Sequence, residues 1–223
     1  MTFPTSLTTP LTRRDALTTL GIGFALIGAM SLLPRRALAA LSPDDRADIG
    51  RIEQYLNGIH TIQSRFDQVA ESGAAATGMI YLQRPGHMRI QYDPPTPILM
   101  VATHGEVFYY DQKLDQISWV QLDQTPAWFL LQDQIRLGDD IAVTDFLHQS
   151  DTLRLTLTEA KRAERGKVTL VLNDQPMELR QWTVIDAQNK TVTVTLNNPE
   201  YGGKIDQNLF TWTDPRSSNA SSH

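Results

Sequence analysis

Residues 83–95 read Gln83-Arg84-Pro85-Gly86-His87-Met88-Arg89-Ile90-Gln91-Tyr92-Asp93-Pro94-Pro95. Proline cannot donate to a strand ladder and glycine frees the backbone, so Pro85-Gly86 marks a bend or a sheet edge. Beyond the bend, successive side chains point to opposite faces of a strand. The apolar face of this strand carries Met88, Ile90 and Tyr92. The stretch therefore predicts a strand, bent at its start, with one apolar and one polar face.

The bend places two arginines in different surroundings. Arg84 lies at the corner beside the apolar face, where the five donors of a guanidinium can hold backbone carbonyls or ligand oxygens. Arg89 points away from Met88 and Ile90, so we expect it on the outer face of the sheet. The alternative for Arg84 is a surface arginine that pairs with an acidic neighbour, a contact that contributes little to stability.

Alternation of apolar and polar residues continues through most of the chain. Segments with this pattern are separated by Pro-Gly, Asp-Pro-Pro, His-Gly and Asn-containing turns. One apolar and one solvated face per strand is typical of an antiparallel sheet. We predict strands over residues 77–83, 87–92, 97–103, 106–111, 116–122, 152–158, 166–173, 178–186 and 190–197, and a last short strand with Phe210 and Trp212.

Helical patterns occur near the start and in the middle of the chain. Ser42 is an expected N-cap with Pro43 at the first helical position, and Asn57-Gly58 loosens the end of this helix. Its apolar stripe, at spacings of three and four, comprises Ile49, Ile52, Leu56 and Ile59, and the helical spacing continues through Ile62 and Phe66. Thr125-Pro126 precedes a second, almost wholly apolar helix over 127–131.

A third helical segment is predicted around 141–148, with Asp139 or Asp140 as its cap. Many strands and few, strongly apolar helices favour a mainly β (α+β) fold over a two-sheet sandwich. We therefore expect a single antiparallel curved sheet that forms an incomplete β-barrel, closed by a lid of short helices.

The N-terminal segment has the pattern of an export signal. Arg13-Arg14 precede a mostly apolar run over residues 17–33, and Ala37-Leu38-Ala39 offers a small-residue cleavage site. The alternative is a retained anchor, but the run is interrupted by Gly, Thr and Ser and is short for a span of about 20 apolar residues. We predict a cleaved twin-arginine-like signal over 1–39, one domain over 40–214, a polar disordered tail over 215–223, and a soluble periplasmic protein after cleavage.

Composition excludes several classes of chemistry. The chain has no cysteine, so thiolate zinc sites, cysteine nucleophiles and an acylated N-terminal cysteine are excluded. The formal net charge is −5 and no basic stretch resembles a nucleic-acid footprint. The histidines lack metal-ligand spacing, and Asp139-Asp140 and Asp111/Asp115 are interpreted as caps and turns. We expect no catalytic residues, no metal and no cofactor.

Large apolar side chains gather where the predicted sheet meets the lid. A single-layer sheet under short helices can enclose more volume than its side chains fill. Methionines and aromatic rings suit a flexible apolar ligand, although for each residue alone an ordinary packed core is the alternative. The residues expected to line one hydrophobic interior are Met79, Met88, Ile90, Tyr92, Leu99, Val101, Phe108, Tyr110, Trp119, Phe129, Leu130, Phe146 and Trp182.

Several segments, taken in order, resemble the LolA family of periplasmic carriers that take lipoproteins to the outer membrane. The matching segments are residues 62–68 (Ile-Gln-Ser-Arg-Phe-Asp-Gln), Gly78, Arg84 to Tyr92, Pro97-Ile98-Leu99, Gly105 with Tyr109-Tyr110-Asp111, Thr125 to Leu131, and Phe210. Their order and spacing cover most of the chain after residue 40.

The resemblance implies an incomplete β-barrel with a helical lid and a cavity for lipoprotein acyl chains. The family's key arginine falls on Arg84, which would hydrogen-bond lid backbone in the closed form and release it when lipid enters. Met88 and Ile90 fall on cavity-facing positions, and Leu130 on an inward-facing position of the lid.

The resemblance also implies the partners of a non-enzymatic monomer. These are outer-membrane lipoproteins, an inner-membrane ABC-type lipoprotein extractor and an outer-membrane lipoprotein receptor if one exists. Two alternatives stay open at this point. One is a carrier of the same fold for another lipid, such as an isoprenoid or a glycolipid, and the other is a protein-interaction module that binds no lipid.

Overall fold

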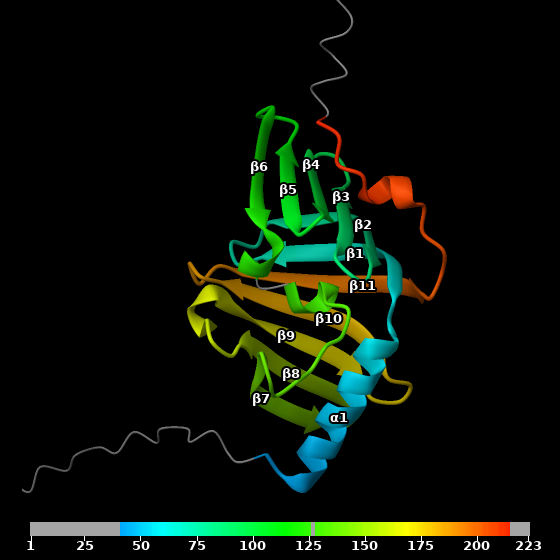
Figure 1. Ribbon diagram of the computed structural model, residues 1–223, viewed down its shortest axis with the longest axis vertical. Coiled ribbons are helices and arrows are strands. Elements are labelled where there is room, and N and C mark those ends of the chain that lie inside the picture. The colour runs from blue at the N-terminus through cyan, green and yellow to red at the C-terminus, as the bar shows by residue number, and fades with distance from the viewer. Residues whose placement is uncertain (1–40, 126–127, 215–223) are drawn as a thin grey trace, which may run out of the picture. The chain divides into compact units, whose positions relative to one another are not determined.

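A computed structural model describes residues 41–125 and 128–214 of the chain (Figure 1). The predicted export signal (1–39) and the predicted tail (215–223) lie outside the described residues. Within the described ranges the chain forms one α-helix, one sheet of eleven strands and four short 3-10 helices.

The sheet is antiparallel throughout and open, with order β6-β5-β4-β3-β2-β1-β11-β10-β9-β8-β7. The strands are β1 Thr61–Ala70, β2 Ala75–Gln83, β3 His87–Tyr92, β4 Ile98–Thr103, β5 Glu106–Asp111, β6 Gln116–Gln121, β7 Ile141–Gln149, β8 Thr152–Glu159, β9 Gly166–Asn173, β10 Glu178–Asp186 and β11 Thr191–Tyr201. β1 pairs with β11, and this pairing joins two runs of sequential hairpins into one curved sheet (Figure 1). The predicted single curved antiparallel sheet is confirmed.

The α-helix, α1 (Pro43–Gly58), begins where the sequence predicts, with Ser42 as its N-cap. Its capping box is complete, because Asp45 N donates to Ser42 Oγ at 3.0 Å and Ser42 N donates to Asp45 Oδ2 at 2.8 Å. The helix buries one apolar stripe, which comprises Ile49, Ile52 and Leu56. Burial of this stripe fixes α1 against one face of the sheet, which we call the inner face.

Loss of the N-cap gives a direct test of this local account. Ser42→Ala removes the acceptor of the Asp45 amide, so we expect the free energy of unfolding to fall by about 1 kcal/mol. Urea unfolding followed by circular dichroism measures this change. Ser118→Ala, at an exposed strand position, is the control and should change the unfolding midpoint little. Equal effects of the two substitutions would contradict the capping role.

The expected helical continuation beyond residue 59 is wrong, because residues 61–70 form strand β1. A spacing of four residues, as between Ile62 and Phe66, fits both a helix and one face of a strand. The strand buries Ile62, Ser64 and Phe66 on the inner face. Ser64 completes the two-residue period but is polar, which hid the alternation.

The helix predicted around 141–148 is also wrong, because these residues form strand β7. The register against β8 shifts between Val143 and Asp145, so one extra residue interrupts the alternation. Inward-facing positions therefore fall at 141, 143, 146 and 148, and the step of three residues from 143 to 146 breaks the period of two expected of a strand. Asp139 and Asp140 lie in the turn before β7 and cap no helix.

Two further short segments differ from the elements predicted for them. The segment around residue 210 is a 3-10 helix, η4 (Gln207–Phe210), rather than a strand. The remaining 3-10 helices are η1 (Leu122–Gln124), η2 (Trp128–Leu131) and η3 (Ala163–Arg165). The expected apolar helix over 127–131 is thus a single 3-10 turn in its described part, and residues 126–127 lie outside the described ranges.

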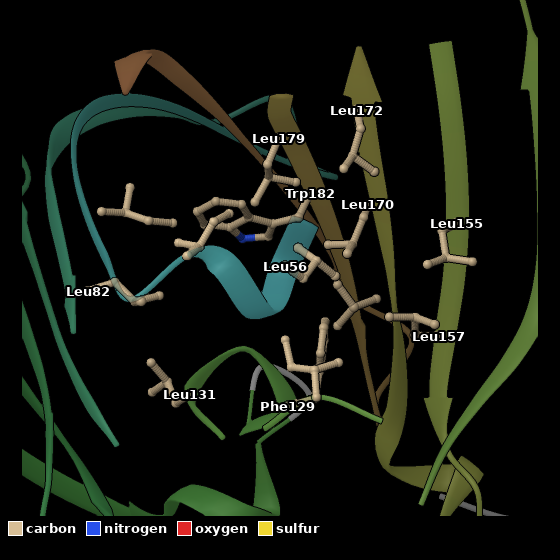
Figure 2. Packing of buried hydrophobic residues seen from close by; sticks show 14 of the residues in the cluster. Leu56, Leu82, Phe129, Leu131, Leu155, Leu157, Leu170, Leu172, Leu179 and Trp182 are labelled. Atoms are coloured by element: carbon tan, nitrogen blue, oxygen red, sulfur yellow. The ribbon is translucent and has the colours of Figure 1, made fainter. Parts of the chain in front are cut away.

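The core fills the space between the inner face, α1 and η2. Its fully buried members come from facing positions of neighbouring strands, such as Leu155 on β8 and Leu170 on β9, which are direct register partners. Figure 2 shows these side chains packed with Trp182 of β10, Leu56 of α1 and Phe129 of η2.

Candidate functional site

A segment between β6 and β7 crosses the inner face of the sheet (Figure 1). We call residues 128–137 of this segment the lid. Its apolar side chains Phe129, Leu131 and Ile135 are buried at 3%, 2% and 1% exposure. Phe129 and Leu131 lie among the core side chains around Leu56 and Leu82 (Figure 2). The lid therefore supplies part of the core it covers.

The interior under the lid is nearly full. The gap beside Arg84 has a volume of about 20 Å³, room for roughly one water molecule. Its walls come from α1, β1, β2, the lid and β10, and comprise Leu56, Ile59, Ile62, Leu82, Arg84, Leu130, Ile135, Leu179 and Trp182. An apolar ligand of any length can enter only if the lid or α1 moves aside.

Arg84 occupies the predicted corner and is buried, with 9% of the residue exposed. Its Nη1 donates to Leu56 O at 2.5 Å and to Ile59 O at 2.9 Å, and its Nε donates to Gln132 O at 2.8 Å. Leu56 is in the last turn of α1, where the helix dipole is negative, and its carbonyl also accepts from Ile59 N at 3.2 Å. The guanidinium therefore joins the end of α1 to the lid.

The charge of Arg84 is maintained despite burial. Desolvation lowers the pKa of its guanidinium, and nearby Asp133 opposes that shift. Because an arginine guanidinium is not deprotonated in proteins, the side chain stays charged. Its close partners are backbone carbonyls, which makes the alternative of a surface ion pair inapplicable.

Four more hydrogen bonds fasten the lid. Gly86 N donates to Leu131 O at 2.8 Å. Asn57 Nδ2 donates to Ile135 O at 2.9 Å, and Ile135 N donates to Asn57 Oδ1 at 2.8 Å. Leu137 N donates to Glu53 Oε2 at 2.7 Å.

Sequence reasoning missed these roles of α1. Asn57 was interpreted only as part of the Asn-Gly helix end. The available signal was weak: Glu53 and Asn57 are four residues apart and so lie on one helix face. Nothing in the sequence alone placed the lid beside that face.

Strand register divides the expected cavity residues between two faces, because directly opposite residues point to the same side. Met88 and Ile90 pair with Leu82 and Ile80, which are buried in the core, so this set faces inward. The inner face and the lid bring together Met88, Ile90, Tyr92, Phe129, Leu130, Phe146 and Trp182.

The expectation of one shared interior is wrong for six residues. Residues that pair with Arg89, Gln91 or Arg65 point to the face opposite to Met88, which we call the outer face. Their register partners on β5 and β6 point to the same outer face. The outer face accordingly carries Met79, Leu99, Val101, Phe108, Tyr110 and Trp119. Both faces of this part of the sheet are apolar, so hydrophobicity alone could not separate them.

The chain segment after η4 explains the second apolar face. The Trp212 ring stacks on Phe108 with 4.7 Å between ring centroids, and Val101 beneath this region is 0% exposed. Trp119, on edge strand β6, is 59% exposed. Arg89 also lies on this face, as predicted, and its Nη1 donates to Leu209 O at 3.3 Å. These outer-face residues are excluded from the interior described above.

Among residues 41–125 and 128–214 no three His, Cys, Asp or Glu side chains gather into a group that could hold a metal ion. The same part of the chain contains no helix long and apolar enough to cross a membrane. The open antiparallel sheet, with its apolar inner face covered by α1 and a hydrogen-bonded lid, is an incomplete β-barrel with an apolar interior.

Residues 57–213 match the profile of the family described as outer membrane lipoprotein carrier protein LolA, and the chain belongs to this family. An outer-membrane lipoprotein carrier protein of Pseudomonas paraeruginosa (strain DSM 24068 / PA7) is 29% identical over 192 residues, covering 77% of this chain and 86% of that protein. A protein of the same name from Methylococcus capsulatus (strain ATCC 33009 / NCIMB 11132 / Bath) is 27% identical over 193 residues, covering 82% and 92%.

A LolA superfamily protein from Nitrosomonas europaea is a solved structural neighbour. It superposes with a TM-score of 0.43 at 10% identity, covering 73% of this chain and 97% of that chain.

Proposed function

We propose that this protein is a non-enzymatic carrier of the periplasm that binds the acyl chains of lipoproteins under its lid. It moves them from the inner to the outer membrane. Support comes from its family and from relatives that are named lipoprotein carriers. The observation that carries the proposal is an apolar inner face covered by a lid whose attachments to α1 and to the β2–β3 corner are hydrogen bonds.

Acyl chains replace the lid as the cover of the inner face. Each methylene that leaves water contributes about 0.8 kcal/mol, so a few methylenes offset the loss of several hydrogen bonds. Cargo must also leave, so the closed form has to compete with bound lipid within a few kcal/mol. Arg84 serves as the latch of the closed form and releases Gln132 O when the lid moves.

The proposed cavity surface is the inner-face set of Met88, Ile90, Tyr92, Phe129, Leu130, Phe146 and Trp182. The proposed partners are an inner-membrane ABC-type extractor as donor and an outer-membrane receptor, where one exists, as acceptor. The protein works as a soluble monomer after cleavage of the signal near Ala39.

The test is capture of a lipoprotein from membranes. The protein is incubated with proteoliposomes that contain a triacylated lipoprotein and, separately, with vesicles that contain only isoprenoid or glycolipid. After sedimentation we expect a 1:1 complex with the lipoprotein in the supernatant, and none with an unacylated form of the same protein. Capture only from the second vesicles would identify a carrier of another lipid, and no capture from either would favour a protein-interaction module.

A further inference from the structure

α1 holds more of the lid than Arg84 does. Three hydrogen bonds join α1 side chains to lid backbone, two from Asn57 to Ile135 and one from Glu53 to Leu137. Arg84 makes a single hydrogen bond to the lid, at Gln132 O.

The other contacts of Arg84 go to α1 itself. Its Nη1 binds the carbonyls of Leu56 and Ile59, and its Nη2 lies 3.4 Å from Asn57 Oδ1. These contacts end on carbonyls at the C-terminal end of the helix and not on the lid, and Leu56 O also accepts from Ile59 N at 3.2 Å. Asn57 differs because both of its short hydrogen bonds end on the lid.

Asn57 makes a paired contact that a simple surface side chain would not make. The amide accepts from Ile135 N and donates to Ile135 O, which fixes residue 135 in position and orientation at once. The Ile135 side chain is 1% exposed, so this contact also sets how the lid enters the core. Glu53, one helical turn before Asn57, holds the next part of the lid at Leu137.

We infer that Asn57 and Glu53 are positioning residues that, together with the Arg84 latch, set how readily the lid opens. This inference deepens the proposed function and depends on it for its meaning in cargo binding. Opening then proceeds by separation of residues 132–137 from the last two turns of α1.

The Gly86 amide reports lid opening without touching either residue. Gly86 N donates to Leu131 O, four residues before the Asn57 contact at Ile135, so loss of this hydrogen bond reports movement of the lid beyond residues 135–137. Its hydrogen exchange therefore separates a moving lid from a local change beside residue 57.

The experiment measures exchange in the full-length protein with Asn57→Ala and with Gln54→Ala, an exposed amide on the same helix. Alanine is the better helix former, so neither change weakens α1 itself. With two hydrogen bonds lost, we expect exchange at Gly86 and Leu137 to accelerate about 10-fold or more in Asn57→Ala. Exchange at Leu155 and Leu170, and every amide in Gln54→Ala, should stay as in the wild type.

The conservative variant completes the design. Glu53→Ala should accelerate exchange at Leu137 and Gly86, and Glu53→Gln, which keeps a carbonyl oxygen as acceptor, should restore slow exchange. Acceleration confined to Ile135 in Asn57→Ala, with Gly86 unchanged, would overturn the inference.

Adding a fluorescent fatty acid to the same variants separates a failure of the positioning role from a failure of the proposed lipid binding. Faster Gly86 exchange without uptake of the probe by any variant would keep the lid contact and refute the proposed lipid binding. Uptake by every variant with equal affinity and unchanged Gly86 exchange would support lipid binding and refute the positioning role.

Discussion

Arg84→Leu is expected to keep acyl cargo bound to the protein and to lower the free energy of unfolding by about 2 kcal/mol. The substitution removes the donor of Gln132 O on the lid, which weakens the closed form. It also leaves the carbonyls of Leu56 and Ile59 without the guanidinium that binds them. Leucine adds apolar surface beside the interior, which favours retained lipid further.

Release of a bound lipoprotein to acceptor vesicles measures the first effect, and urea unfolding measures the second. A charge-assisted hydrogen bond to the lid contributes about 1.5–3 kcal/mol, so we expect release to slow by at least about 10-fold. Arg89→Leu is the matched control, since Arg89 is a partly buried arginine on the outer face with no contact to the lid. Wild-type release by Arg84→Leu, or equal retention by both variants, would refute the latch.

Gly78→Ala is expected to destabilise the protein by about 3 kcal/mol or more, near or beyond the upper end of overpacking effects. A Cβ at this position would lie 2.3 Å from Gln91 O on β3 and 2.8 Å from the ring of Phe66 on β1. Neither neighbour can yield easily. Gln91 O is backbone of the paired strand, and the Phe66 ring is buried and packs edge-on against Tyr92.

Denaturant unfolding of Gly78→Ala should show a lower midpoint. Hydrogen exchange of the amides that pair β2 with β3 should be faster than in the wild type. Gly50→Ala provides a control of opposite sign, because Gly50 is at an exposed position of α1 and a Cβ there would meet nothing within 4 Å. We expect that variant to be more stable by up to about 1 kcal/mol. A stable Gly78→Ala protein with an unchanged midpoint would contradict the close approach of these three strands.

Alternation predicts strands well where nothing interrupts it. β3, β5 and β9 begin and end at the predicted residues, because their period of two is regular and turns bound them. β10 also has the predicted bounds, although its register against β9 shifts between Leu179 and Gln181. β1 failed because Ile62 and Phe66 fit both periods, and β7 failed because a bulge near Thr144 shifts the phase. A bulge is set by pairing with another strand, which a local pattern does not record.

The sequence predicted the position of Arg84 at the bend before β3, but not which face of the sheet each apolar residue occupies. The turn signal and the family pattern singled out Arg84, and the structure buries it between α1 and the lid. The assignment of Phe108 and Trp119 to the interior failed for a long-range reason. Trp212, far along the chain, stacks on Phe108 at the outer face, so an apolar residue there has a packing partner outside the interior.

The central claim is that acyl chains bind on the inner face. The chain has four tryptophans, and two of them report opposite faces: Trp182 lines the interior, and Trp119 lies on the outer face. Variants that keep only Trp182 or only Trp119, with phenylalanine at the other three positions, are titrated with a lipopeptide whose acyl chains carry bromine. We predict that bromine quenches the fluorescence of Trp182 and leaves Trp119 unchanged, whereas quenching of Trp119 alone, or of neither tryptophan by bound lipopeptide, would contradict the account.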